Sequence, residues 1–308
     1  MTGGWNMKYA VIDVGSNTVR LSVYRVENKK FEQLFTVKET VGLAGYIKEK
    51  KMSEEGMEQA ARTLNRFKRI LNQFDIDRVW VFATASLRNI KNSEETVKYI
   101  LENTGYHIEI LSGRDEAMYD FFGVRSQYDI TEGLIFDIGG GSTEIITCEN
   151  REPCVFESVG IGALNLYYDC VSKIIPGKKE IECIQRKIRK ELKTLFGCEI
   201  CLKKFKTEEI IGVGGSIRAL LKIVNLYYKK EARNRTITVK ELNEILELAL
   251  EKNKKLQRMI LKACPERVHT LIPGMLIAKN IAEKTKCRSI FVSRCGVREG
   301  YLYKKMLA

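Results

Sequence analysis

The sequence predicts an α/β protein made of two domains of similar design. Three observations support this fold class. Strands alternate with helices along the whole chain, one strand–turn–strand pattern occurs near the start of each half, and 308 residues suffice for one large or two ordinary domains. Hydrophobic residues make up 44% of the chain and charged residues 30%, which is typical of a globular protein rather than a disordered one.

In the first half, alternating apolar residues predict strands, and apolar residues that recur with the helical period predict helices. Ser53 is a suitable N-cap for the first long helix, Ser93 for the second, and Gly105 is a suitable stop for the second. The predicted elements are strands at 8–14, 19–26, 78–85 and 107–111, and helices at 53–74, at 93–103 and from Asp115 onward.

The second half repeats this alternation. Strands are predicted at 133–138, 144–148, 154–159, 209–213 and 288–293, and helices near 161–170, 178–195, 216–227, 239–251 and 274–284. We place the domain boundary near residue 120, which gives domains at 1–120 and 121–308. The C-terminal helix is expected to pack back on the first domain, and Met7 could be the true start of the chain.

Two segments share one pattern. AVIDVGSNTVRLSV (10–23) and LIFDIGGGSTEIIT (134–147) each have an apolar strand that ends in Asp, a turn of small residues and a second strand. Asp13 then corresponds to Asp137, with one extra residue in the second turn. The repeat predicts a duplicated domain, in which the two turns face each other across a cleft.

The two turns have the composition of a phosphate site. Small residues expose consecutive backbone N–H groups, which form a concavity for an anion, and short hydroxyl and amide side chains add donors. A third turn at 212–215 leads into a helix near Ser216, whose first N–H groups also attract anions. The candidate phosphate-binding residues are Asp13, Gly15, Ser16, Asn17, Thr18, Gly139, Gly140, Gly141, Ser142, Thr143, Gly214, Gly215 and Ser216.

Asp137 and Glu144 flank the second turn, where their charges would repel a phosphate. A cation between carboxylates and phosphate would remove this repulsion, and oxygen ligands favour Mg²⁺ or Mn²⁺. We therefore expect both carboxylates to be metal ligands. The alternative is a plain glycine-rich hairpin with acidic surface residues.

The net charge and the cysteine content limit the classes of protein to which this chain can belong. The net charge is +13, and basic runs at 186–193, 203–206 and 229–235 are either solvated helix faces or surfaces that attract polyanions. No apolar run approaches the ~20 residues of a membrane span. Nine cysteines without a secretory signal fit a reducing cytoplasm. Cys198 and Cys201 make one CxxC motif without a second cysteine pair, whereas a tetrahedral zinc site needs about four ligands.

These motifs resemble the exopolyphosphatase/guanosine pentaphosphate phosphohydrolase (Ppx/GppA) family. The resemblance runs from Met7 to the end through DVGSNT, ATASLR (83–88), ILSGRDEA (110–117), FDIGGGSTE, GVGGSIRAL and GVREG (296–300). It implies two actin-like, ribonuclease-H-like domains with a cleft between them. It also implies Glu116 as the catalytic base, Asp137 and Glu144 as carboxylates that position metal and water, and Arg88 as a phosphate-contacting residue.

Each of these assignments has an alternative. Asp115 and Glu116 could simply favour the start of a helix, and Arg88 could be an ordinary surface arginine. One position departs from the family pattern, since ERVHTLIPG has His269 where the family has Asp. We expect His269 to be a packed or hydrogen-bonded histidine.

We predict a cytoplasmic exopolyphosphatase that hydrolyses terminal phosphate from inorganic polyphosphate with Mg²⁺ or Mn²⁺. The alternatives are hydrolysis of guanosine pentaphosphate, an actin-like ATPase or kinase, and a non-catalytic polyphosphate sensor. The presence of Glu116, Asp137 and Glu144 argues against a sensor, because sensing alone does not require a base. Expected partners are polyphosphate or guanosine pentaphosphate and a second copy in a homodimer, with no nucleic acid and no membrane.

Overall fold

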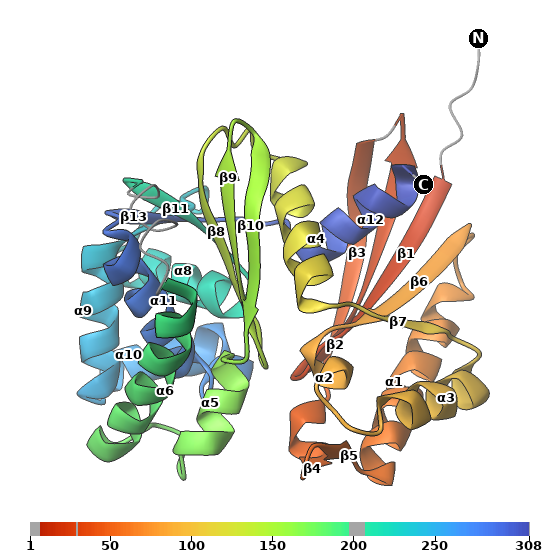
Figure 1. Cartoon of the computed structure of the whole chain (residues 1–308), viewed down its shortest axis with the longest axis horizontal. Coiled ribbons are helices and arrows are strands. Elements are labelled where there is room, and N and C mark those ends of the chain that lie inside the picture. Colours follow the sequence, from red (N-terminus) through yellow and green to blue (C-terminus); the bar gives the residue numbers. More distant parts are fainter. Residues whose placement is uncertain (1–6, 29, 197–206, 308) are drawn as a thin grey trace. The chain divides into compact units, whose positions relative to one another are not determined.

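The computed structural model describes residues 7–28, 30–196 and 207–307, and its ribbon is drawn in Figure 1. The chain forms two compact units. Unit 1 takes the chain up to Glu116 and again from Tyr301, and unit 2 is Ala117–Gly300. Within the described residues, no helix has both the length and the apolar content to cross a membrane.

Unit 1 is a five-stranded sheet with helices packed on it. Its strand order is β3-β2-β1-β6-β7. The strands β1 to β3 are antiparallel neighbours, and β1, β6 and β7 are parallel. Apolar side chains of α1 and the sheet form its core. The elements are β1 (Met7–Val14), β2 (Thr18–Glu27), β3 (Lys30–Thr40), the 3₁₀ turn η1 (Leu43–Tyr46), β4 (Ile47–Lys48), β5 (Lys51–Met52), α1 (Glu54–Leu71), β6 (Arg78–Ala83), α2 (Ala85–Arg88), α3 (Ser93–Thr104) and β7 (Ile108–Ile110).

Unit 2 is a six-stranded sheet, in the order β10-β9-β8-β11-β13-β12. Its main hydrophobic core lies between this sheet and the helices of the same unit. The helix α4 (Gly113–Arg125) begins in unit 1, and α12 (Val297–Leu307) returns to it. The remaining elements are β8 (Gly133–Ile138), β9 (Thr143–Glu149), β10 (Glu152–Val159), α5 (Ala163–Cys170), α6 (Lys178–Phe196), β11 (Glu209–Val213), α8 (Gly215–Tyr227), β12 (Thr236–Thr238), α9 (Val239–Leu250), α10 (Lys254–Ala263), the 3₁₀ turn η2 (Pro265–Arg267), α11 (Leu271–Thr285) and β13 (Ser289–Val292).

The two sheets repeat one topology. In each, an antiparallel meander of three strands is followed by two parallel strands, and β12 is an added edge strand in unit 2. The α/β fold with two sheet-plus-helix units is thus confirmed. The expected extra residue in the second turn is wrong, because Val14 pairs with Val19 and Ile138 with Thr143, so both turns have the same length.

Most predicted elements are present within a few residues of the expected bounds. Ser53 caps α1 by accepting from the N–H of Gly56, and Gly105 ends α3 in the left-handed conformation. Ser93 is not the cap of α3, since Asn92 holds that position and Ser93 is helical. The strands β3, β4, β5 and β12 and the helices α2 and α10 were not predicted, whereas the expected C-terminal helix is α12.

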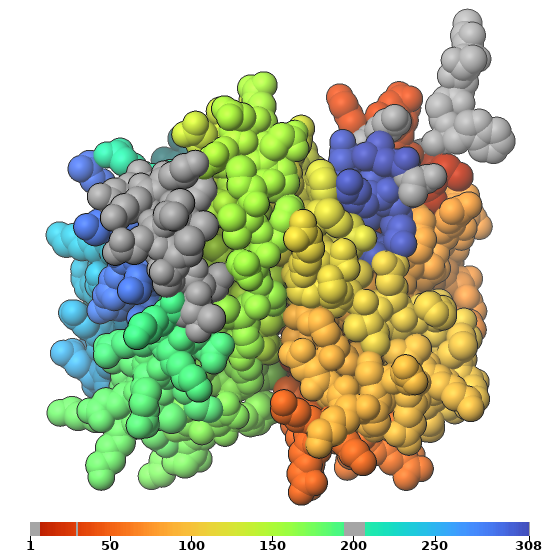
Figure 2. Space-filling model, viewed as in Figure 1, coloured from red at the N-terminus to blue at the C-terminus, as the bar shows by residue number. Residues whose placement is uncertain are grey.

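The basic run 186–193 lies on α6, whose atoms are green in Figure 2. Its Ile188 and Leu192 are buried, whereas Arg189 and Lys190 are exposed. This run is therefore a solvated helix face. The run 203–206 and the pair Cys198 and Cys201 lie outside the described residues.

The cysteines are not all reduced in this structure. Cys170, at the end of α5, forms a disulfide with Cys183 of α6, with 5.8 Å between their Cα atoms. Neither residue was singled out from the sequence, because cysteine pairing depends on how two helices pack. The bond ties the end of α5 to α6.

Candidate active site

The turn between β1 and β2 has its carbonyl groups tied into unit 1. The carbonyl of Ser16 accepts from the N–H of Ala44, and that of Asn17 accepts from Val41 and Gly42. In a trans peptide the next N–H points the opposite way, so the N–H groups of Asn17 and Thr18 point away from this segment. Asn17 Nδ2 is buried and has no hydrogen-bond partner within the described chain. The turn therefore presents donors toward a ligand.

The turn between β8 and β9 is held in the same way by α5. The carbonyls of Gly139 and Gly140 accept from the N–H groups of Ala163 and Leu164, both at 2.9 Å. The carbonyl of Gly141 accepts from Asn165 Nδ2 at 3.0 Å. The N–H groups of Gly140, Gly141 and Ser142 consequently point away from α5, as an anion-binding concavity requires.

Close packing explains why this contact needs glycine. A Cβ atom on Gly162, the N-cap of α5, would collide with the backbone of Gly140 and Gly141. One predicted donor is used elsewhere, since the hydroxyl of Thr143 donates to the carbonyl of Ile161 at 2.6 Å. The hydroxyl of Thr143 therefore serves the fold, and we no longer count it as a phosphate donor.

The third turn packs against charged side chains of unit 2. Gly214 has φ 96° and ψ 169°, a backbone conformation essentially restricted to glycine, and a Cβ there would collide with Asp137 Oδ1. A Cβ on Gly215 would collide with the guanidinium of Arg267. Ser216 Oγ is buried without a hydrogen-bond partner among the described residues. The turn thus brings one carboxylate and one arginine to its two glycines.

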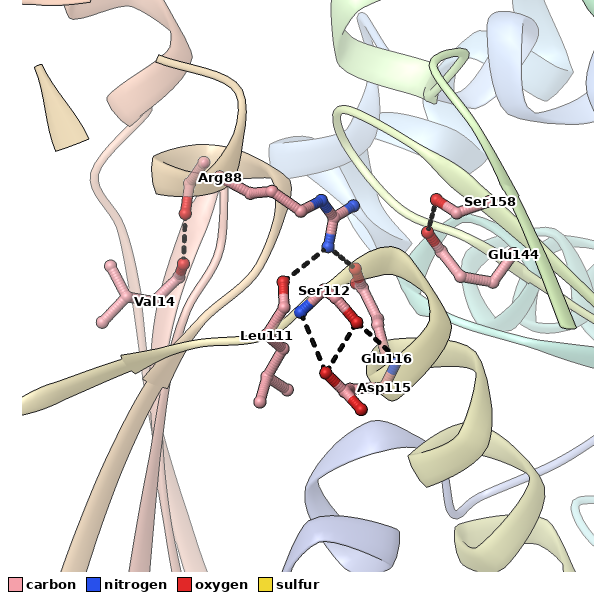
Figure 3. A network of polar contacts seen from close by, with 9 residues as sticks. Val14, Arg88, Leu111, Ser112, Asp115, Glu116, Glu144 and Ser158 are labelled. Carbon is pink, nitrogen blue, oxygen red and sulfur yellow. Dashed lines mark hydrogen bonds and ion pairs between the residues drawn. The ribbon is translucent and has the colours of Figure 1, made fainter. Parts of the chain in front are cut away.

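Asp137 and Glu144 lie directly opposite each other on the antiparallel strands β8 and β9. Opposite residues of such a pair point to the same face of the sheet, where like charges destabilise each other. Glu144 is 1% exposed, and its Oε1 accepts from Ser158 Oγ at 2.7 Å (Figure 3). Two opposed carboxylates held this way suit a cation that binds oxygen ligands.

The donor set fits Mg²⁺ or Mn²⁺, which are often held by one or two carboxylates, with water and substrate phosphate completing the shell. Among the described residues, no group of three or more His, Cys, Asp or Glu side chains forms a denser metal site. Asp137 and Glu144 are the metal ligands that the sequence predicts, and their oxygen atoms fit such an ion.

Glu116 and Arg88 form a mostly buried ion pair in unit 1. Arg88 Nη1 donates to Glu116 Oε2 at 2.7 Å and to the carbonyl of Leu111 at 3.0 Å (Figure 3). The two side chains are 18% and 10% exposed. Arg88 is thus no ordinary surface arginine, because it is mostly buried and is held in an ion pair with Glu116.

The two acids at the start of α4 have separate roles. Asp115 Oδ2 accepts from the backbone N–H and the hydroxyl of Ser112, and Ser112 Oγ accepts from the N–H of Asp115. This reciprocal arrangement is a capping box, which stabilises the helix start. Asp115 therefore serves the helix, whereas Glu116 is directed to Arg88 (Figure 3).

Arg267 and Arg218 were not assigned from the sequence. Arg267 is 9% exposed beside Gly215; burial lowers the pKa of its guanidinium, which Glu266 and Asp137 counteract. Arg218 Nε donates to the carbonyl of Gly214 at 3.0 Å. Arg267 lies two positions before His269 in the segment ERVHTLIPG, but its contact with a glycine turn depends on the fold.

His269 is packed, as expected. Its ring meets that of Tyr167 edge to face, with 5.1 Å between centroids. Burial lowers its pKa, and the nearby charge of Arg267 lowers it further. Both effects favour the neutral form of the imidazole.

A known protein family matches most of this chain. The model of the Ppx/GppA phosphatase family matches residues 22–308. The chain belongs to the Ppx/GppA phosphatase family. Membership makes it an enzyme that hydrolyses phosphoanhydrides.

Individual relatives span nearly the whole chain. A Haemophilus influenzae protein named "Putative exopolyphosphatase" is 26% identical over 296 residues, which cover 96% of this chain and 90% of that protein. The solved structure of an Aquifex aeolicus family member has a TM-score of 0.77 at 24% identity and covers 98% of both chains. The structure of an exopolyphosphatase from Cytophaga hutchinsonii has a TM-score of 0.85 at 22% identity, over 97% of this chain and 98% of that one. The fold is therefore that of the family.

Proposed function

We propose that this member of the family is an exopolyphosphatase, which removes the terminal phosphate from inorganic polyphosphate. The carrying observation is the opposed pair Asp137 and Glu144, held beside a glycine turn whose N–H groups are directed outward. This combination suits a phosphate bound together with a divalent cation. The names of the relatives support polyphosphate as the substrate.

The proposed reaction is hydrolysis by an activated water molecule. The water oxygen attacks the terminal phosphorus, Glu116 accepts the water proton on a carboxylate oxygen, and the bond to the bridging oxygen breaks. The bridging oxygen leaves with the shortened chain. General-base assistance of this kind contributes roughly 10²–10⁴-fold.

The other residues hold the phosphate group. Arg88 is a planar donor suited to holding Glu116 and phosphate oxygens at once. The N–H groups of the turns at 15–18 and 139–142 would bind non-bridging oxygens. A divalent cation at Asp137 and Glu144 would supply positive charge that offsets the negative charge of the transferring phosphoryl group.

The test measures phosphate release from long polyphosphate, short polyphosphate, guanosine pentaphosphate and ATP, each with Mg²⁺, with Mn²⁺ and with a chelator. The proposal expects metal-dependent release from polyphosphate that greatly exceeds release from ATP. Faster release from guanosine pentaphosphate would replace polyphosphate by that substrate. Turnover of ATP alone would contradict the proposal and favour an actin-like ATPase.

A further inference from the structure

Unit 2 contains a basic pocket whose lining residues do not form the glycine turns. Its volume is about 440 Å³, which lies within the range of about 300–1,000 Å³ that is usual for small-ligand sites. The wall consists of one face of α8 and of the loop that leads to β12. Its polar lining residues, which we call the basic pocket, are Arg218, Lys222, Asn225, Lys230, Asn234 and Arg235.

The pocket gathers four positively charged side chains, which the fold neutralises only in part. No carboxylate is among the residues that line it. Arg235 donates to the carbonyl of Val292, and Lys222 donates to that of Ala263. Lys230 has an acidic partner, Glu241, at 2.6 Å. A carbonyl oxygen accepts a hydrogen bond but carries no full negative charge. The positive charges of Lys222 and Arg235 are therefore not neutralised by these bonds.

The arginines of the pocket also act on each other. Burial lowers the pKa of the Arg235 guanidinium, and the charges of Arg294 and Arg218 lower it further, while Tyr128 opposes this. Arg218 is attracted by Glu299, Asp137 and Asp120. A bound anion would relieve the mutual repulsion of the arginines.

The loop wall is built before any ligand arrives. Asn234 Nδ2 donates to Asn225 Oδ1 at 2.7 Å, and Asn225 Nδ2 donates to the carbonyl of Asn234 at 3.2 Å. The N–H of Lys230 is bonded to the carbonyl of Asn225 at 2.9 Å. These bonds join α8 to the loop, so little conformational entropy would be lost on binding.

The position in the sheet also suits a ligand. Arg235 is bonded to Val292, the last residue of β13, and ligands of α/β sheets gather beyond the carboxyl ends of parallel strands. Arg218 spans from the pocket to the carbonyl of Gly214. An anion in the pocket would therefore contact a side chain that is hydrogen-bonded to the third glycine turn.

We propose that the basic pocket is a second anion site of this protein, for a ligand with two or more adjacent phosphate groups. Several cations around one concave site favour such a ligand over a single charge. The phosphates can belong to an inorganic oligophosphate or to a nucleoside diphosphate, which share this chemistry. The site goes beyond the proposed hydrolysis, because its occupation does not require catalysis.

The test is calorimetric titration with methylenediphosphonate, whose P–C–P link is not hydrolysed, in metal-free buffer of fixed ionic strength. We expect Lys222→Gln to weaken one class of site by roughly tenfold, because a charge-assisted hydrogen bond is lost. Lys179→Gln removes the same charge from an exposed position on α6, and it should leave that site unchanged. Asp137→Asn should also leave it unchanged.

A second variant tests the same site by filling the pocket with a bulky side chain. Ala232 lines the pocket and is exposed, so Ala232→Trp would fill the space without removing a charge or disturbing the core. It should weaken the same class of site as Lys222→Gln. A parallel titration with ADP identifies the source of the phosphates, since equal affinity indicates the phosphates alone and tighter binding indicates a nucleotide. The proposal is overturned if neither compound binds, if Lys222→Gln and Ala232→Trp bind as the wild type does, or if Lys179→Gln weakens binding as much as Lys222→Gln.

Discussion

Arg88 donates to Glu116 across 2.7 Å, although 28 positions separate the two residues in the chain. The same nitrogen of Arg88 donates to the carbonyl of Leu111, which precedes the capping residue Ser112. The carboxylate is thus fixed both through its own helix and through a partner from α2. A charged, positioned carboxylate is what the proposed general base requires.

We expect Glu116→Gln to lower phosphate release by at least about 10²-fold, since the amide cannot accept the water proton. Polyphosphate binding should be nearly unchanged, because the side chain keeps its shape. The matched control is Asp115→Asn on the same helical turn, which alters the helix cap and should keep most of the activity. A Glu116→Gln enzyme that works at a substantial fraction of the wild-type rate would remove Glu116 as the base.

The sequence predicted the hairpins well and the side-chain partners poorly. The turns at 15–18 and 139–142 were identifiable because glycine and short polar residues interrupt apolar strands. The packing of Gly162 on Gly140, of Arg267 on Gly215 and of Cys170 on Cys183 was not predictable, because each contact depends on how distant segments pack. Edge strand β3 and the short strand β12 were missed for a related reason, since tertiary pairing decides such segments more than local propensity does.

Metal dependence should change when either opposed carboxylate is neutralised. Asp137→Asn and Glu144→Gln each remove one anionic oxygen ligand from a site suited to Mg²⁺. We expect a higher Mg²⁺ concentration at half-maximal rate in both variants, together with a lower maximal rate. Glu157→Gln is the control, because Glu157 is exposed on β10 opposite Ile145 rather than Glu144. If the Mg²⁺ midpoint stays at the wild-type value in both site variants, the metal binds elsewhere.

Gly214→Ala should lower both stability and activity. Its backbone conformation costs about 1–3 kcal/mol in a residue with a side chain, and the new methyl group would displace the carboxylate of Asp137. Urea unfolding and phosphate release measure the two effects. Gly160→Ala serves as the control, since a Cβ at Gly160 meets no atom within 4 Å. Equal stability of Gly214→Ala and Gly160→Ala would show that the third turn tolerates a side chain.

The disulfide between Cys170 and Cys183 can be detected by peptide mapping. Peptide mapping of protein prepared without reductant should recover Cys170 joined to Cys183, 13 positions apart. Closing a loop of this size stabilises the folded state by up to about 3 kcal/mol, so Cys170→Ser should unfold at lower urea. Cys154→Ser, at an exposed free cysteine, should not. Recovery of both residues as free thiols would contradict the pairing.

The carboxylate of Glu180 makes the stability of the folded protein depend on pH in the acid range. Its carboxylate accepts from the N–H of Gly177 at 2.7 Å and from the N–H and hydroxyl of Ser172 at 2.8 and 2.7 Å. These hydrogen bonds lower the pKa of Glu180 from 4.5 to about 2, and the bond from Gly177 has the largest effect. A folded-state pKa below the unfolded value means that the stabilisation is complete above about pH 4.5 and is lost as the pH falls toward 2.

We therefore expect Glu180→Gln to be less stable than the wild type near neutral pH, and the difference to shrink as the pH is lowered from about 5.5 to 3. Urea unfolding at several pH values within this range measures it. Glu182→Gln, at the next exposed acid of α6, corrects for the loss of one negative charge from the strongly basic chain. A difference between wild type and Glu180→Gln that does not vary with pH would mean that these three hydrogen bonds do not bind the carboxylate more tightly than the carboxylic acid.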